Sequence, residues 1–510
     1  MYIEPNTRII FLQDCPLDSS YENTIYFDDL TEQYNYFYSL KKHELSNQSY
    51  NRIKKGVSRV QLKAEDLYNC NYMMFQNSSF GNKWFYAFIT NVEYVSNIVC
   101  EVYFTIDDLQ TWFFDIELLE CFVEREHSLT DNVGDNVITE NVGLGEYVYS
   151  AFTDTGLFDE WNIVVASNVS PGGLDVSGGK YGGMYSGLTY YAFDNDAIGY
   201  DTVNSFIETV SSLNKQDGIV AFYMVPKFAV DGFSSELIRV QTITKAIPSK
   251  LGSYTPKNKK LLTYPYTFEY VTTFNGEHSE FRYEQFIGDV MQFSISGDVT
   301  PTSTFLCTPM NYMFNGGNFN EAVTLDKLPL CSYSTDAYKA WVAQNKSVLT
   351  QQTAMGVVGG ATALIGGAIS GNIGVAVGGG LTIASAVTNV MAQNEKAQAV
   401  SNPIHGTTSG VVEFALGVLD FHFTQMFVKE DFARTIDEYF NMFGYATKLV
   451  KKPNINSRPH WNYVQTIGCN IIGSCPGDAI TNIKKIFDKG ITFWKNGEEV
   501  GNYSLDNSPT

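Results

Sequence analysis

The sequence predicts a mainly β protein with α+β insertions and one long hydrophobic loop. Phe and Tyr are abundant among the 510 residues, with 35 and 32 copies, and aromatic side chains favour pleated, half-buried strands. Short aromatic or β-branched runs separated by turn residues recur along most of the chain. One stretch, residues 347–394, contains no charged residue. A chain of this length is expected to form several domain-sized units.

Five segments differ in sequence character. The predicted domains are a β domain at residues 1–148, an α/β insertion at 149–260, a second β segment at 261–333, a helix with a hydrophobic glycine-rich loop at 334–400, and a C-terminal β/α segment at 401–510. The insertion contains a glycine-dense run at 171–187, which is typical of a loop.

The N-terminal segment and the insertion have clear strand and helix signals. Five runs of aromatic or β-branched residues predict strands at 8–12, 57–62, 83–89, 98–104 and 121–124, and two others predict helices at 31–40 and 106–114. The insertion predicts strands at 162–166, 188–193 and 219–225. Between them, Asp201 or Thr202 can cap a helix whose apolar face carries Val203, Phe206, Ile207, Val210 and Leu213.

Two further elements are predicted near the C-terminal half. Residues 267–274 and 277–283 flank Asn275-Gly276, the residue pair that a tight hairpin turn favours. Asp431 can cap a helix that ends at Gly444, with an apolar stripe of Phe432, Ile436, Tyr439, Phe440 and Phe443. A last strand is expected at 491–494.

Net charge and cysteine usage restrict the function classes. The net charge of −21 excludes tight binding of nucleic acid through phosphate neutralisation. The chain could still surround DNA without holding it, because like charges repel, although solubility explains the charge equally well. The eight cysteines form no CxxC pair and are predicted to be reduced core residues. The first residues lack a secretory signal, so we expect assembly in a cytoplasm.

Enzymatic signals are weak, and we predict no catalytic residue, metal site or cofactor. The six histidines lack metal-binding helical spacing. His127 could be a proton shuttle, but we expect a surface or interface residue. Asp107, Asp108 and Asp115 lie near aromatic residues, as in a glycosidase cleft, although solvated acids around a helix explain them equally well.

The uncharged stretch is the principal candidate site. From about residue 356 to 390 it is long enough to cross a bilayer once, or to form two half-spans. Small residues four apart allow close helix packing in lipid, whereas glycines disfavour a helix in water. We predict insertion into a membrane under some conditions. The alternatives are a buried or lumen-plugging loop and a permanent anchor. The predicted membrane-inserting residues are Gly356, Val357, Val358, Gly360, Leu364, Ile365, Gly367, Ile369, Gly371, Ile373, Gly374, Val375, Val377, Gly378, Gly380, Leu381, Ile383 and Val387.

Several motifs resemble those of the tail-knob or major tail proteins of small short-tailed phages (podoviruses) of Gram-positive bacteria. They lie towards both ends of the chain and once in its middle, in order: 72–77 (YMMFQN), 81–88 (GNKWFYAF), 104–107 (FTID), 109–112 (LQTW), 114–116 (FDI), 123–127 (VEREH), 264–266 (YPY) with the following turn at 275–276 (NG), 450–454 (VKKPN), 462–463 (NY), 465–466 (QT), 486–488 (IFD), 490–492 (GIT) and 501–504 (GNYS). Residues 149–260 do not match clearly and look shorter than the family's insertion.

The resemblance implies a structural virion protein at the distal tail. It implies tube-forming β-barrel or sandwich domains that assemble as a homo-hexameric ring, with residues 1–148, 261–333 and 401–510 in the tube and 149–260 on the outside of the knob. Expected partners are the proximal tail tube or connector, the tail tip, double-stranded DNA in transit without specific binding, and the host cytoplasmic membrane, which the hydrophobic loop penetrates during genome ejection. The alternative is a receptor-binding or wall-degrading tail-tip protein.

Overall fold

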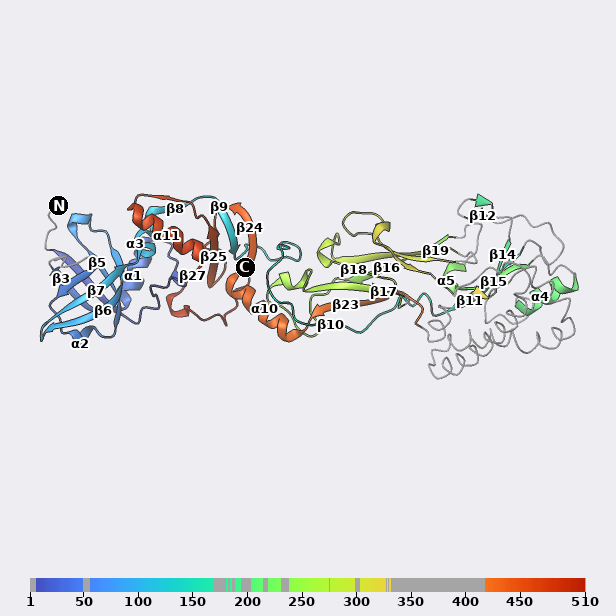
Figure 1. Cartoon of the computed structure of the whole chain (residues 1–510), viewed down its shortest axis with the longest axis horizontal. Coiled ribbons are helices and arrows are strands. Elements are labelled where there is room, and N and C mark those ends of the chain that lie inside the picture. Colours follow the sequence, from blue (N-terminus) through green and yellow to red (C-terminus); the bar gives the residue numbers. More distant parts are fainter. Residues whose placement is uncertain are drawn as a thin grey trace. The chain divides into compact units, whose positions relative to one another are not determined.

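The computed structural model describes residues 6–48, 56–167, 180–181, 184–185, 189–193, 203–213, 219–230, 238–274, 276–298, 303–326, 328, 330–331 and 418–509 (Figure 1). The chain divides into two compact units. Unit 1 comprises Met1–Glu146, Ser253–Leu261 and Lys429–Thr510, and unit 2 comprises Tyr147–Gly252 and Leu262–Val428. Unit 1 is therefore assembled from stretches that are far apart in sequence, whereas only residues 253–261 separate the two stretches of unit 2.

A six-stranded antiparallel sheet forms the N-terminal part of unit 1, coloured blue in Figure 1. Its strands, in spatial order, are β3 (Lys41–Gln48), β1 (Thr7–Gln13), β5 (Cys70–Gln76), β6 (Phe85–Ser96), β7 (Val99–Ile106) and β4 (Val57–Val60). Alternate residues of β1 point to opposite faces. Ile9 and Phe11 join one apolar core with α2 (Ala64–Leu67). Ile10 and Leu12 join another with α1 (Leu30–Ser39). The sheet is consequently buried on both faces at β1 and β5, whereas the edge strand β3 has no buried residue.

A five-stranded sheet forms the rest of unit 1. Its order is β2 (Asn23–Ile25), β27 (Ile491–Trp494), β25 (Trp461–Ile467), β9 (Cys121–Glu126) and β24 (Tyr445–Lys451). β2 and β27 are parallel, and the other pairs are antiparallel. The short strands β8 (Ile116–Leu118) and β26 (Ile471–Gly473) pair beside it. Helices α3 (Asp108–Trp112) and α11 (Gly477–Lys489) contribute Leu109 and Ile483 to the core of this sheet.

The described residues of unit 2 form three four-stranded sheets. The first has the order β10 (Tyr147–Tyr149), β23 (His422–Val428), β17 (Thr267–Thr272) and β18 (His278–Phe281). The second has the order β14 (Thr189–Phe193), β11 (Trp161–Ser167), β15 (Ile219–Pro226) and β22 (Leu330–Cys331). The third has the order β16 (Ile238–Ala246), β19 (Val290–Asp298), β20 (Phe305–Pro309) and β21 (Val323–Leu325). Residues of all three sheets share one aromatic-rich core. In it, the ring centroids of Phe293 in β19 and Phe423 in β23 are 5.1 Å apart.

Shorter elements complete the described chain. They are helices α4 (Val203–Ser212), α5 (Lys227–Val230) and α10 (Glu430–Phe443), strands β12 (Lys180–Tyr181) and β13 (Met184–Tyr185), and 3-10 turns at Ser78–Phe80, Phe113–Asp115, Lys259–Leu262, Tyr283–Gln285, Phe319–Glu321 and Gly497–Glu499.

The predicted fold class, mainly β with α+β insertions, is confirmed. Helix α1, strand β27 and the hairpin β17–β18 lie where the sequence places them, with Thr272 opposite His278. Of the eight cysteines predicted in the interior, the seven whose side chains are described are free, and six of these are buried. The hexameric ring and the five-segment division stay predictions.

Two local expectations need correction. Helix α10 begins at Glu430, so Asp431 lies in the first turn instead of capping it, and Lys429 occupies the N-cap position without a side-chain hydrogen bond. Its inward face holds Ala433, Ile436, Asp437 and Phe440, whereas Phe432 of the predicted stripe is 42 % exposed. Strand β16 was not predicted, and it pairs with β19 along its whole length.

Candidate functional site

All eighteen predicted membrane-inserting residues, Gly356 to Val387, lie outside the described residues. Their role therefore stays a prediction. Among the helices that the structure does describe, none combines the length and the apolar character needed to cross a bilayer. The described residues instead contain a polar centre that holds the three stretches of unit 1 together.

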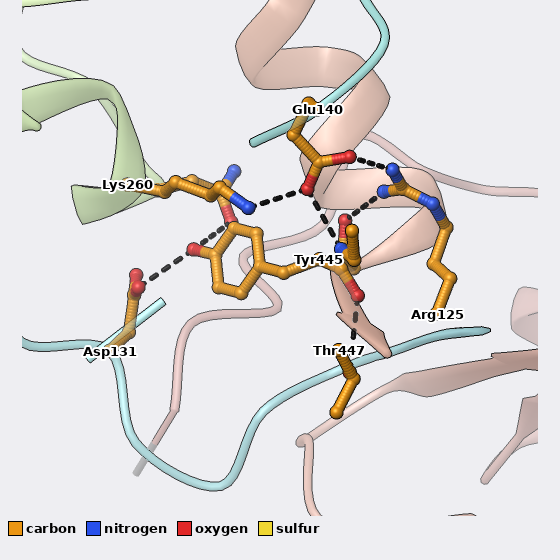
Figure 2. A network of polar contacts seen from close by, with 9 residues as sticks. Arg125, Asp131, Glu140, Lys260, Tyr445 and Thr447 are labelled. Atoms are coloured by element: carbon orange, nitrogen blue, oxygen red, sulfur yellow. Dashed lines mark hydrogen bonds and ion pairs between the residues drawn. The ribbon is translucent and has the colours of Figure 1, made fainter. Parts of the chain in front are cut away.

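A buried carboxylate, Glu140, lies at the middle of this centre (Figure 2). The Lys260 ammonium is 2.6 Å from Glu140 Oε1, and the Arg125 guanidinium forms an ion pair with Oε2. The backbone N–H of Ala446 also donates to Oε1, over 2.8 Å. Only 1–2 % of the Glu140 and Lys260 side chains is exposed, so loss of one partner would leave an uncompensated buried charge. Glu140 thus joins all three stretches of unit 1.

Aromatic rings surround the Lys260 ammonium, which lies 5.4 Å from the ring centroid of Tyr445 and 5.6 Å from that of Phe440. Burial lowers the pKa of Lys260, although Glu140 opposes this effect. The Tyr445 hydroxyl donates to Asp131 Oδ1 over 2.7 Å, as Figure 2 shows. Asp131 Oδ2 accepts from the Lys259 N–H over 3.0 Å. The centre therefore combines cation–π contacts with a hydrogen-bonded carboxylate.

A second carboxylate, Asp437 of α10, fixes the short stretch Ser253–Leu261. It accepts four hydrogen bonds, from the Tyr254 hydroxyl (2.6 Å), Lys257 N (2.7 Å), Asn258 N (2.9 Å) and Asn258 Nδ2 (2.7 Å). Asp437 is 1 % exposed. Buried backbone donors need acceptors, and Asp437 supplies one for the N–H of Lys257 and one for the N–H of Asn258.

His127 is buried rather than at a surface or interface, so that expectation is wrong. Its side chain is 2 % exposed. Nδ1 accepts from the N–H of Tyr463 over 2.8 Å, and Nε2 lies 3.1 Å from the carbonyl of Asn441. Burial, aided by the nearby Arg458 charge, lowers the pKa of His127 to about 3. The neutral ring therefore links β25 to the end of α10.

The three carboxylates considered for a glycosidase cleft each have structural partners. Asp107 caps α3 by accepting from Gln110 N over 3.0 Å, and it also accepts from the Tyr72 hydroxyl over 2.8 Å. Burial raises the pKa of Asp107 to about 6. Asp115 forms an ion pair with Lys83 at 2.5 Å, and Asp108 accepts from Asn482. Within the described ranges, no group of three His, Cys, Asp or Glu is arranged to hold a metal ion.

Unit 2 has its own buried carboxylate, Asp420, two residues before β23. Its oxygens accept from Thr155 Oγ1 (2.5 Å), Thr155 N (3.1 Å), Gly156 N (3.1 Å) and Phe421 N (2.6 Å). Burial raises the pKa of Asp420 to about 7. These hydrogen bonds attach the segment before β23 to residues 155 and 156.

Sequence reasoning missed Glu140, Asp437 and Asp420. The signal for Asp437 was present, because it lies between Ile436 and Phe440 on a helical face that is otherwise apolar. Glu140 and Asp420 gave no comparable signal, since Lys260 lies 120 residues from Glu140 and Thr155 lies 265 residues from Asp420 in sequence.

The fold resembles that of a solved phage protein. The similarity to the tail knob protein gp12 of bacteriophage C1 covers 98 % of this chain and 99 % of that chain, with a TM-score of 0.65 and 17 % sequence identity. This likeness defines the fold as that of a tail knob protein.

Sequence comparisons place the chain more narrowly. Residues 226–508 match the family described as the C-terminal domain of the tail knob protein gp9 of Bacillus phage phi29, and residues 5–117 match the Caudoviral major tail protein N-terminus. The gp9 proteins of Bacillus phages phi29 and B103 are 28 % and 24 % identical, over 98 % of this chain and of each relative. The chain therefore belongs to the tail knob family of short-tailed phages and is a structural component of the virion tail.

Proposed function

We propose that this chain builds the distal tube of the tail, conducts DNA through it, and carries a hydrophobic segment that first plugs the tube and then penetrates the host cell membrane. The observation that carries the proposal is the charge-free, glycine-rich stretch within 347–394 of a chain otherwise related to tail knob proteins along nearly its whole length. Other tail proteins, namely the proximal tube or connector and the tail tip, would be its neighbours in the virion.

The tube requires a closed ring, and we propose six copies joined head to tail. The low charged fraction, 17 %, supports burial of much surface between copies, because subunit contacts are depleted in charge. Native mass spectrometry and electron microscopy of the purified full chain test this directly. We expect a hexamer with six-fold symmetry. A stable monomer at virion-like local concentrations, or a ring of another order, would contradict it.

Conduction of DNA is supported by the net charge of −21. A wall that repels phosphates lets the duplex slide, whereas a basic wall would release counterions and hold it. Gel-shift titration of the ring with short duplex DNA at physiological salt should therefore give no tight complex. Tight binding that weakens steeply with added salt would show that the protein grips DNA and would refute this part of the proposal.

Penetration of the membrane is supported by the composition of residues 356–390, which are apolar and small. A charge placed in such a segment costs about 2.5–3.5 kcal/mol at the centre of a bilayer. Vesicle leakage should therefore fall strongly for Ile365→Asp and for a variant with residues 356–390 replaced by a polar linker of equal length. Val240→Asp is the matched control, because Val240 of β16 is an apolar residue that is already 63 % exposed. Equal leakage from all four proteins would exclude a role for the segment.

A further inference from the structure

Two buried cysteines of unit 1 lie side by side. Cys121 begins β9, and Cys469 follows β25. They are 6 % and 4 % exposed, and the side chain of Cys121 interacts with that of Cys469 and adds to the rise in its pKa. The chain separation between them is 348 residues, so this contact joins the first and last stretches of unit 1.

Strand pairing holds the two cysteines in place from both sides. Phe122 is paired with Ile467, and Leu118 is paired with Ile471. Between these pairs, Leu119 N donates to the carbonyl of Asn470 over 2.9 Å. The two antiparallel segments are therefore held together on both sides of the cysteines, with Phe122 opposite Ile467 and Leu118 opposite Ile471, which keeps the two cysteine backbones close together.

We propose that Cys121 and Cys469 are a disulfide-forming pair, reduced during assembly and cross-linked when the folded chain meets a small-molecule disulfide outside a reducing cytoplasm. One protein thiolate attacks the small disulfide and releases one small thiol. The second protein thiolate attacks the resulting mixed disulfide and releases the other small thiol. Two protein thiols and one small disulfide thus give one protein disulfide and two small thiols.

The cross-link would covalently join the first and last stretches of unit 1. It would connect β9 to the bend after β25 independently of the chain between them, which includes all of unit 2. Because a bond that closes a long loop restricts the unfolded chain, unit 1 should resist denaturant more strongly once the bond has formed. The exchange should be slow at neutral pH, since burial raises the pKa of Cys469 to about 12 and thiolate is scarce.

Peptide mapping of the intact full-length protein tests the pair without any substitution. The folded chain is incubated with cystamine at pH 8.5 until the half-exposed Cys475 is modified, then alkylated, digested without reductant and analysed by mass spectrometry. We expect a peptide linked through Cys121 and Cys469, and a urea midpoint of unit 1 that rises and returns to its starting value with dithiothreitol. Free thiols at both positions, separate cystamine adducts at each, or a link that forms only in urea would overturn the proposal.

Two variants sharpen the test. Cys121→Ser should abolish the linked peptide and the dithiothreitol-sensitive shift. Cys15→Ser is the matched control, because Cys15 is 5 % exposed in the same unit. It should retain both effects, and their loss in this control would overturn the assignment to the 121–469 pair.

Discussion

Replacement of Asp437 by alanine is the sharpest test of how unit 1 is held together. The substitution removes the acceptor of four hydrogen bonds from Tyr254, Lys257 and Asn258. A buried donor without an acceptor costs about 1–3 kcal/mol. Water can replace the lost acceptor at the half-buried Tyr254 hydroxyl, so the total cost is less than the sum for four buried donors. We therefore expect the unfolding free energy of unit 1 to fall by about 4 kcal/mol. Asp437→Asn keeps one acceptor oxygen and should lose about 2 kcal/mol.

Hydrogen exchange with mass spectrometry, at increasing urea, resolves this effect by segment. Peptides from Ser253–Leu261 and from α10 should lose protection together in Asp437→Ala, whereas peptides from the β11–β15 sheet should be unchanged. Glu438→Ala is the matched control, because Glu438 is exposed on the same helix, and it should cost less than about 0.5 kcal/mol. Equal protection in Asp437→Ala and Glu438→Ala would refute the role assigned to this carboxylate.

Three further predictions concern other buried positions. Because the folded chain holds the Asp107 proton more tightly than the unfolded chain does, stability from this group is full below about pH 4 and is lost as pH rises through about 6. Asp107→Asn should therefore gain up to about 3 kcal/mol over the original protein in urea titrations between pH 4 and 7, and a pH-independent difference would contradict this. Gly444→Ala should lower the free energy of unfolding by about 3 kcal/mol or more, since the added Cβ would overlap the Glu126 carbonyl. Gly468→Ala is the control, because Gly468 also has a positive φ but faces open space, and it should cost about 1 kcal/mol. Similar losses for both variants in thermal unfolding would argue against the overlap. Asp420→Ala should speed hydrogen exchange of the amides of residues 155 and 156 at least tenfold. Unchanged exchange would show that Asp420 does not hold these two amides.

Local elements were predictable because their signals are local. Helix α1 follows from an aromatic stretch that Asp29 caps through two backbone hydrogen bonds. The hairpin β17–β18 follows from Asn275-Gly276 between two apolar runs. Strand β27 consists of four buried residues after Gly490, at which the preceding helix α11 ends.

Assembly of unit 1 was not predictable, because it depends on contacts between distant residues. The stretch Ser253–Leu261 has no apolar period, and its polar contacts to distant residues, among them Asp437, Asp131 and Glu140, tie it to the rest of unit 1. His127 follows three charged residues in sequence and was therefore expected at a surface or interface. Its burial depends on Tyr463 and Asn441, more than 300 residues away.

Cross-linking of the intact protein to photoactivatable phospholipids is the most direct test of the central claim, that a charge-free segment of a tail knob protein enters the host membrane. Vesicles with the reactive group near the chain ends report contacts deep in the bilayer. The account predicts adducts concentrated within residues 356–390, with few on the described surfaces of either unit. Adducts confined to other parts of the chain, or none while the same vesicles leak, would contradict it.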